Sequence, residues 1–186
     1  IVRFFSLPAD APGLAASSCR FEQAKKLGAT DDLLASPGGQ LAEEIASVVS
    51  GETSRTARYA TTVSLLKAAF GERFFWCGFY EVDPRKECEL VVGPYQGTLG
   101  CLRIPFAKGV CGACATARET IIVPDVHVFP GHIACDSASN SEIVVPVFDA
   151  SGALVAVLDV DSTSFAAFDE VDARGLEAAC RAMMAG

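Results

Sequence analysis

The stretch EIVVPVFDASGALVAVLDVDS, residues 142–162, predicts a β-hairpin and decides the fold class. Two apolar runs, 142–148 and 153–160, flank the segment DASG, whose residues favour a tight turn between strands. Both alternating sets of side chains in the second run are apolar, and a strand of this kind is buried on both faces. We therefore expect a sheet that is covered on each of its two faces.

Two helices are expected before the first strand. The first helix ends at Gly51, and one of its faces carries four apolar residues, Leu41, Ile45, Val48 and Val49. Thr53 is placed to cap the second helix, which Gly71 closes. Residues 1–37 are rich in Ala, Pro and Ser, so we predict a poorly defined N-terminal extension there and one domain over 38–186.

Further strands and helices surround the hairpin. Aromatic and β-branched runs predict strands over 74–82, 88–93, 101–106 and 120–125. Small residues predict a short helix over 109–119, and Asp169 can cap a last helix. With the hairpin this makes six strands, most of them joined as antiparallel neighbours. The order predicts an α+β fold with a central antiparallel sheet and helices packed on it.

Composition excludes several classes of protein. The 186 residues carry a net charge of −8 and no cluster of Lys and Arg, whereas binding to nucleic acid requires a basic face. No apolar run approaches the roughly 20 residues that span a bilayer. Hydrophobic residues make up 51% of the chain, which is enough for a full core. We expect a folded protein that contacts neither nucleic acid nor a membrane.

Eight cysteines allow two interpretations. A framework of structural disulfides is typical of small secreted domains that lack a core, and this chain has a core. Four of the eight fall within 35 residues: Cys101, Cys111, Cys114 and Cys135. This clustering favours reactive thiols in a reducing compartment, and we expect a cytoplasmic location.

The hairpin register brings three carboxylates together. A symmetric closure pairs Phe148 with Ala153, which sets Glu142 opposite Asp159, with Asp161 one step further on the same face. Three interpretations stay open. The acids are solvated where the sheet ends, they hold Ca²⁺ or Mg²⁺, or they combine a proton-donating carboxyl with anions for a cationic substrate.

Cys111 and Cys114 form a C-x-x-C at the start of the short helix, which also has three interpretations. It is a redox pair, or part of a zinc site completed by His127, His132 or Cys135, or two small buried residues. The helix dipole is expected to lower the pKa of the Cys111 thiol.

Cys135 differs from these thiols because it lies in a polar loop of Gly, His, Ser and Asn, just before the strand that carries Glu142. A buried structural thiol more often lies within an apolar run. A cysteine nucleophile needs activation by amides or by a nearby cation, which either histidine could supply. Cys135 is therefore a candidate nucleophile.

Four segments together carry a family resemblance: WCGFY (76–80), GPYQGTLGCLRIPFAKGVCGACA (93–115), DVHVFPGHIACDSASNSEIVVPV (125–147) and GALVAVLDVDS (152–162). They resemble free methionine-(R)-sulfoxide reductases, GAF-domain enzymes that reduce free and not protein-bound methionine sulfoxide. The resemblance covers roughly residues 39–184 and implies a GAF-like fold. It also implies a thiol-dependent oxidoreductase.

The resemblance implies a role for each matching residue. Cys135 matches the catalytic cysteine, Cys101 the usual resolving cysteine, and Cys111 the third family cysteine. The substrate pocket is implied to consist of Trp76, Tyr80, Glu142, Asp159 and Asp161. Cys114 departs from the family, which has a small residue there, usually Ala. The resemblance further implies no bound metal or cofactor, a homodimer, and reduction by thioredoxin, supplied with electrons by NADPH through thioredoxin reductase.

The chemistry of this reaction fits the residues. A thiolate attacks the sulfoxide sulfur, the oxygen leaves when a neutral acid protonates it, and the resulting sulfenic acid condenses with a second thiol to a disulfide. The alternative is a GAF module without catalytic activity, which binds a small ligand or senses oxidation. Because function depends on the site and not on the fold, only the joint presence of thiols and acids separates the two.

Overall fold

The computed structural model describes residues 37–133 and 135–185, and its centre is one six-stranded antiparallel sheet. The strands lie in the order β3-β2-β1-β6-β5-β4. Their bounds are β1 (Trp76–Val82), β2 (Glu89–Gln96), β3 (Arg103–Pro105), β4 (Ile121–Val123), β5 (Ser141–Phe148) and β6 (Leu154–Ser162). The predicted α+β class with a six-stranded antiparallel sheet is confirmed.

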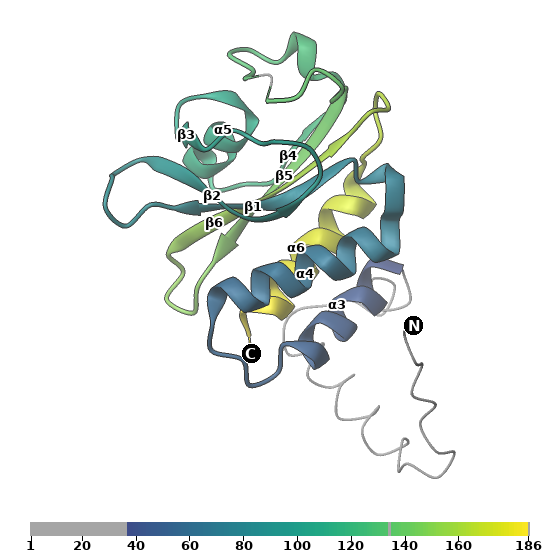
Figure 1. The fold of residues 1–186 in the computed structure, drawn as a ribbon, viewed down its shortest axis with the longest axis vertical. Helices are drawn as coiled ribbons and strands as arrows, with labels where there is room; N and C mark the ends of the chain where they lie inside the picture. The colour runs from purple at the N-terminus through teal and green to yellow at the C-terminus, as the bar shows by residue number, and fades with distance from the viewer. Residues whose placement is uncertain (1–36, 134, 186) are drawn as a thin grey trace.

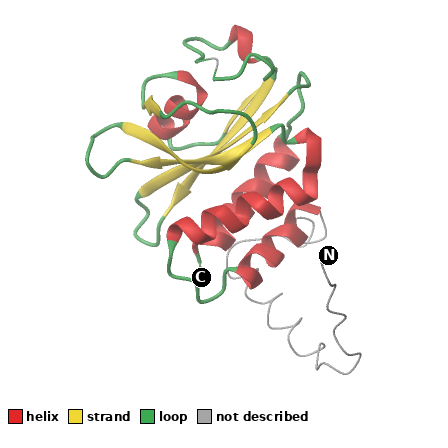
Figure 2. Cartoon of the chain, viewed as in Figure 1, coloured by secondary structure: helices red, strands yellow, loops and turns green. Residues whose placement is uncertain are grey.

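Helices cover the sheet unequally (Figures 1 and 2). Three long helices form a layer on one face: α3 (Pro37–Val48), α4 (Arg55–Phe70) and α6 (Glu170–Met184). The short helix α5 (Gly109–Ala117) lies on the other face, against β5 and β6. Two 3₁₀ turns, η1 (Gly71–Arg73) and η2 (Val126–Val128), complete the described elements. None of the helices in the described ranges has both the length and the apolar character that crossing a membrane requires.

Two predictions about the helices are wrong: one concerns the residue that caps α4, and the other the buried face of α3. Ser54, not Thr53, caps α4, because its hydroxyl accepts a hydrogen bond from the Ala57 amide. Val48 is 56% exposed and lies off the buried face of α3, whereas the other three predicted residues, Leu41, Ile45 and Val49, are buried. Asp169 caps α6 as predicted, within a capping box.

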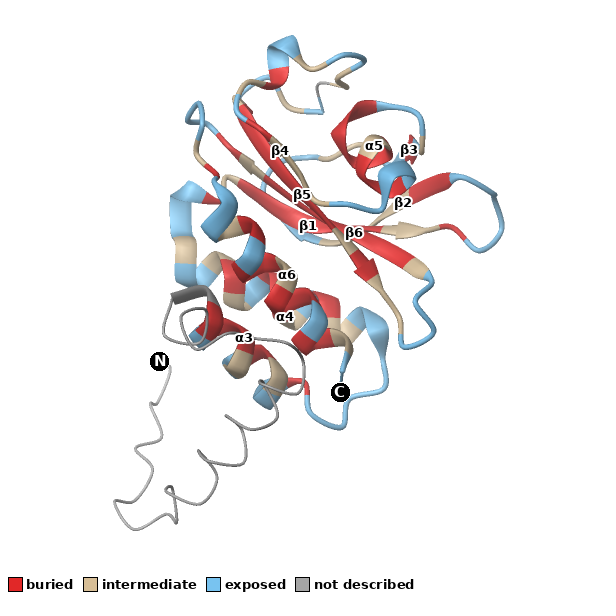
Figure 3. Ribbon diagram, turned by 180° about the vertical axis from the view of Figure 1, so that it is seen from behind, coloured by how far each residue is buried: buried red, intermediate tan, exposed pale blue. Residues whose placement is uncertain are grey.

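Side chains of β5 and β6 alternate between two separate cores. Ile143, Val145 and Leu158 face the helical layer, where they pack with residues of α3, α4 and α6. Val144 and Val157 face the opposite side, where they pack with α5. Buried residues therefore run along the central strands on both sides (Figure 3), and the prediction of two covered faces is confirmed.

The register of the hairpin differs from the predicted one. Phe148 pairs with Leu154 and not with Ala153, and the register shifts again between Val147 and Phe148. The turn is asymmetric because the Asp149 carboxylate accepts hydrogen bonds from the amides of Ser151 and Ala153. The net shift is two residues, so Glu142 lies opposite Asp161 and not opposite Asp159.

A shift of two residues leaves every side chain on its predicted face, because side chains alternate with a period of two. Glu142, Asp159 and Asp161 therefore share one face of the sheet, as the sequence predicted. The predicted N-terminal extension lies almost entirely in residues 1–36, outside the described residues, and the domain boundary at residue 38 stays a prediction.

We expect the two-sided burial of β6 to carry much of the stability. Leu158 is fully buried against the helical layer, whereas Leu102 is 71% exposed. Leu158→Ala should lower the free energy of unfolding by about 2–5 kcal/mol, through lost burial and a cavity. The matched Leu102→Ala should change it by less than about 0.5 kcal/mol. Urea unfolding measures both, and equal midpoints for the two variants would contradict this view of the core.

Candidate functional site

A cavity of about 40 Å³ lies on the sheet face opposite the three long helices. Strands β1, β5 and β6 form its floor, and α5 and the loops around residues 97–102 and 131–140 cover it. Seven of the eight predicted site residues line it: Trp76, Tyr80, Cys111, Cys135, Glu142, Asp159 and Asp161. The eighth, Cys101, is bonded to Cys135.

The strand register explains why these side chains meet. Trp76 pairs with Asp161 across β1 and β6, and Asp161 pairs with Glu142 across β6 and β5. One step along the sheet, Asp159 lies between Gly78 and Val144. The floor thus has two rows of cross-strand neighbours. The first row is Trp76, Asp161 and Glu142, and the second is Gly78, Asp159 and Val144.

Cys101 and Cys135 form a disulfide that joins the two loops above the floor. Their Cα atoms are 5.4 Å apart, and 34 residues separate them in the sequence. A second link lies beside it, because the Thr98 hydroxyl donates a hydrogen bond of 2.5 Å to the Asp136 carboxylate. Cys135 is exposed, so the disulfide lies where solvent and the cavity meet.

Two of the three carboxylates are buried and the third is half-buried, and loss of solvent is the main cause of their raised pKa values. Glu142 and Asp159 are each 6% exposed, and Asp161 is half-buried. The pKa of Glu142 rises well above its ordinary value because burial and the charges of Asp159 and Asp161 all disfavour its ionised form. Burial and Asp159 do the same to the pKa of Asp161.

Asp159 differs from its neighbours. Burial raises the pKa of Asp159 to about 7, while contacts with Cys111 and Glu142 oppose the rise. At neutral pH this carboxyl is therefore the first of the three to ionise. Near pH 7 Asp159 is partly ionised, while burial favours the neutral acid forms of Glu142 and Asp161, so the cavity offers proton donors beside a partial anion.

Basic side chains do not neutralise these acids. Of the described residues that line the cavity, His132 is the only one with a basic side chain. Burial and the neighbouring His127 lower the pKa of His132, so it is neutral at pH 7. A positive charge therefore has to come from a ligand.

The prediction that the pKa of the Cys111 thiol is lowered is wrong. The helix dipole was expected to lower its pKa, but burial and the charges of Asp159 and Glu142 raise the pKa well above the ordinary value. The Cys111 thiol lies 3.9 Å from the Glu142 carboxylate. Desolvation and like charge outweigh the dipole, whose effect is small and falls off within one turn.

The zinc site proposed from the sequence does not assemble. Cys135 is held in the disulfide, and the Cys114 sulfur points at the Val144 carbonyl oxygen, 3.6 Å away, within the packed layer between α5 and β5. His127 lies on the surface, where its Nδ1 is 2.9 Å from the Asp125 carboxylate. His132 alone of the two histidines lines the cavity.

Aromatic rings form the wall above the acids. Trp76 stacks on Tyr80 and on Tyr95, with ring centroids 5.6 Å and 5.2 Å apart, and its indole N–H donates to the Thr98 carbonyl. Gly78 permits this arrangement. A Cβ there would lie 2.7 Å from the Trp76 ring and 2.2 Å from the Tyr95 Cβ.

Sequence reasoning missed Gly78, which makes room for the aromatic wall, and two polar residues that line the cavity. Gly78 carried no signal, because its role depends on a neighbouring strand. Asp136 and Ser139 also line the cavity, and both belong to the polar loop around Cys135, which was itself the available signal; His132 of the same loop was already a candidate from the sequence.

Comparison with known proteins agrees with the fold and shows the family. The family model of the GAF domain matches residues 52–184. The chain is 44% identical to the free methionine-R-sulfoxide reductase of Escherichia coli over 130 residues, which is 70% of this chain and 76% of that protein. The chain belongs to the family of GAF-domain free methionine-R-sulfoxide reductases.

Solved structures extend the likeness to three dimensions. A free methionine-R-sulfoxide reductase of Neisseria meningitidis, in complex with its substrate, is 45% identical and superposes with a TM-score of 0.75, covering 84% of this chain and 90% of that chain. A structure described as a putative GAF sensor protein of Burkholderia vietnamiensis is 48% identical, with a TM-score of 0.74, and covers 79% of this chain and 90% of that one.

The raised pKa of Asp159 lowers the free energy of unfolding at neutral and higher pH. Between the ordinary value of 3.8 and about 7, the folded state keeps a proton that the unfolded state has lost. The free energy of unfolding should therefore fall as the pH rises through this window, by at most about 4 kcal/mol from this group.

Asp159→Asn should remove this loss, so the variant should be more stable than the wild type at pH 8 and should depend less on pH between 5 and 8. Glu119→Gln removes one charge from an exposed position and should leave the slope unchanged. Urea unfolding at several pH values measures the effect, and an Asn variant that is less stable at pH 8 would contradict it.

Proposed function

We propose that this chain reduces free L-methionine-(R)-sulfoxide to L-methionine through a cysteine sulfenic acid and a disulfide. The observation that carries the proposal is the disulfide between Cys101 and Cys135, which borders a cavity of buried carboxylates and aromatic rings. Membership of the reductase family supports the same reaction.

In the first step the Cys135 thiolate attacks the sulfoxide sulfur. This attack forms an S–S bond while the substrate oxygen takes up a proton. The S–O bond and the new S–S bond then break as the oxygen transfers to Cys135, which becomes a sulfenic acid and releases methionine. The departing oxygen needs a proton, and a carboxylic acid that stays neutral at pH 7 can donate one. Glu142 suits this role because its pKa is raised and it lies buried in the cavity.

In the second step the Cys101 thiol attacks the sulfenic acid, which gives the disulfide and one water. An external dithiol then has to reduce this disulfide by exchange through a mixed disulfide. We propose thioredoxin for this step, with electrons from NADPH through thioredoxin reductase. Such a cycle suits a cytoplasmic protein, and the homodimer implied by the family resemblance stays a prediction.

The acids also select the substrate. Free methionine sulfoxide carries an α-ammonium, and Asp159 is the carboxyl of the three that ionises most readily. Trp76 and Tyr80 offer an apolar wall for the thioether and methyl groups. A pocket that carried only a thioether would have no use for three buried acids.

A non-catalytic sensor is the second candidate, and the similar structure from Burkholderia vietnamiensis carries that description. A sensor of oxidation needs the two thiols but has no need of a proton donor beside them. The purified protein with free methionine sulfoxide, thioredoxin, thioredoxin reductase and NADPH separates the two, because a sensor does not oxidise NADPH repeatedly.

We expect the cysteines to have separable effects. Cys135→Ser should abolish both turnover and the release of one equivalent of methionine by the reduced protein without reductant. Cys101→Ser should keep this single release and lose most of the thioredoxin-driven turnover, with Cys111 as a partial substitute. Quantifying methionine after rapid mixing measures both.

Cys114→Ser serves as the control, because its sulfur packs against β5 and away from the disulfide. A larger recycling defect in Cys114→Ser than in Cys101→Ser would overturn the assignment of the resolving thiol. Release of methionine by Cys135→Ser would remove that residue from its role.

N-acetyl-methionine sulfoxide should be a poor substrate. Acetylation replaces the ammonium with an amide, which leaves a buried carboxylate unpaired and costs about 1–3 kcal/mol or more, equivalent to a tenfold to hundredfold lower kcat/KM. Glu142→Gln should also lower activity strongly. Equal kcat/KM values for the free and the acetylated (R)-sulfoxide would contradict the selection by charge.

A further inference from the structure

One end of the cavity holds a thiol and two carboxylates close enough to share one ion. Cys111 on α5, Glu142 on β5 and Asp159 on β6 each offer a ligand atom, and these atoms lie within 4.8 Å of one another. The Cys111 Sγ and the Glu142 Oε1 are 3.9 Å apart. All three side chains are buried, so one helix and two central strands fix the group.

Asp159 adds an independent observation that points to a ligand. Its Oδ1 is buried and has no hydrogen-bond partner among the described residues, although the side chain lines the cavity. A buried oxygen without a partner costs free energy until something binds it. An ammonium group would satisfy this oxygen, but it gives no reason for a thiol at the same point.

The spacing suits a small cation that binds sulfur and oxygen. Zinc bonds of about 2.3 Å to sulfur and 2.1 Å to oxygen place the ligand atoms of a tetrahedral site about 3.6 Å apart. The pair at 3.9 Å needs a shift of a few tenths of an ångström, and because all pairs lie within 4.8 Å the other pairs need a shift of about 1 Å at most. Three protein ligands leave the fourth position open to the cavity, as in zinc sites that exchange a water.

The ligand types decide which cation fits. Ca²⁺ and Mg²⁺ prefer oxygen alone, whereas a thiolate selects softer ions. The cavity also lacks a Lys or Arg side chain among its described lining residues, so no fixed cation competes for the carboxylates.

We propose that Cys111, Glu142 and Asp159 form a binding site for a thiophilic divalent cation of the zinc type, and that this cation and the substrate exclude each other. The ion would occupy the carboxylates that receive the substrate's ammonium, so the exclusion, though not the metal site itself, rests on the proposed function. The cation is a competitor of the substrate and not a cofactor of the reaction.

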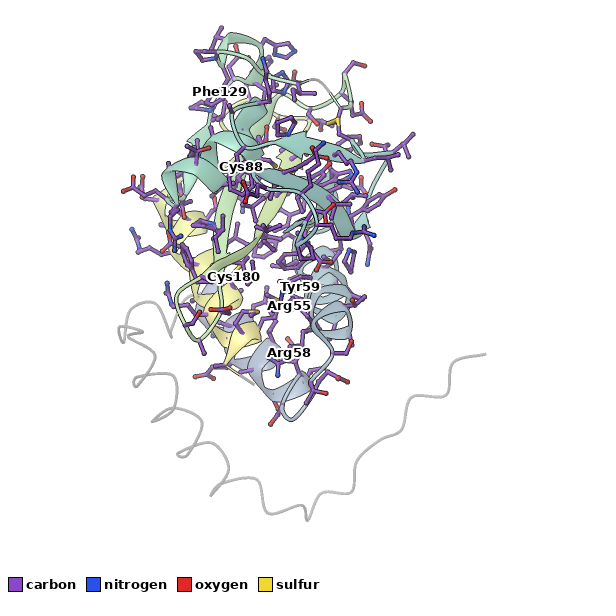
Figure 4. All side chains as sticks on the ribbon, turned by 90° about the vertical axis from the view of Figure 1, so that its left-hand side faces the viewer. Arg55, Arg58, Tyr59, Cys88, Phe129 and Cys180 are labelled. Carbon is purple, nitrogen blue, oxygen red and sulfur yellow. A yellow bond between two sulfur atoms is a disulfide. The ribbon has the colours of Figure 1, made fainter. Side chains whose placement is uncertain are left out.

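The disulfide form of the protein isolates the site. Cys101 and Cys135 are then blocked, and among the residues that the structure describes five thiols stay free, of which Cys88 alone is exposed. Cys180 lies on α6 in the helical layer (Figure 4), where it faces another cavity. Co²⁺ is the probe, because a thiolate bound to it gives a charge-transfer absorption in the near ultraviolet.

We expect one equivalent of Co²⁺ to give this absorption and Zn²⁺ to displace it. Cys111→Ser should abolish the absorption, and Asp159→Asn should weaken Co²⁺ binding at least tenfold. Cys88→Ser and Cys114→Ser are the controls and should retain both. Thermal unfolding of each variant verifies that it is folded. Absorption that persists in Cys111→Ser, or that disappears in Cys88→Ser, overturns the site.

Competition is measured without turnover in the reduced Cys135→Ser variant. Free methionine sulfoxide should raise the apparent Kd for Co²⁺ in proportion to its concentration. Binding of Co²⁺ through Cys111 that methionine sulfoxide does not affect overturns the mutual exclusion and leaves the metal site standing. A chain that turns over methionine sulfoxide but gives no thiolate absorption overturns the metal site and leaves the proposed function intact.

Discussion

Three carboxylates buried on one face of β5 and β6, in a cavity whose described lining contains no Lys or Arg, are the constraint on which the structure depends. Each carboxyl that loses its proton there adds an unpaired charge to a medium of low polarity. The other face of the same strands offsets this cost. It is apolar except for the paired Ser141 and Ser162 at the strand ends, and α3, α4 and α6 cover it with a large core. The buried acids, which lower the stability of the fold, thus lie on the sheet face opposite the large core.

The loops that cover the cavity also follow from the need to keep these carboxylates away from solvent. Acids that must stay buried and yet admit a substrate need a lid made of loops, and the two loops here are joined by the disulfide and by the bond between Thr98 and Asp136. Trp76 ties the first loop to the floor through its bond to the Thr98 carbonyl. The disulfide therefore joins the two loops that cover the acidic cavity.

Local chemistry made most of the fold predictable, whereas relations between distant segments limited what could be predicted for the site. Hydrophobic periodicity located every strand, and side-chain alternation placed the three acids on one face even though the register was wrong by two residues. The turn could not be predicted because the Asp149 carboxylate reorganises it. The pKa of Cys111 was predicted in the wrong direction, because its sequence position shows a helix start but not the acids across the cavity. The requirement for glycine at position 78 arises only from the closeness of Trp76 and Tyr95, which the sequence does not show.

Burial also separates the thiols by role. Exchange with an external dithiol needs a sulfur that can be reached and that leaves as a thiolate. Cys111 is 3% exposed and Cys114 is fully buried, and burial raises the pKa of both. Only the disulfide of Cys101 and Cys135 lies at the surface end of the cavity. These constraints favour Cys101 as the resolving thiol. Cys114 instead fills the packed layer between α5 and β5, and Cys111 lies against the Glu142 carboxylate.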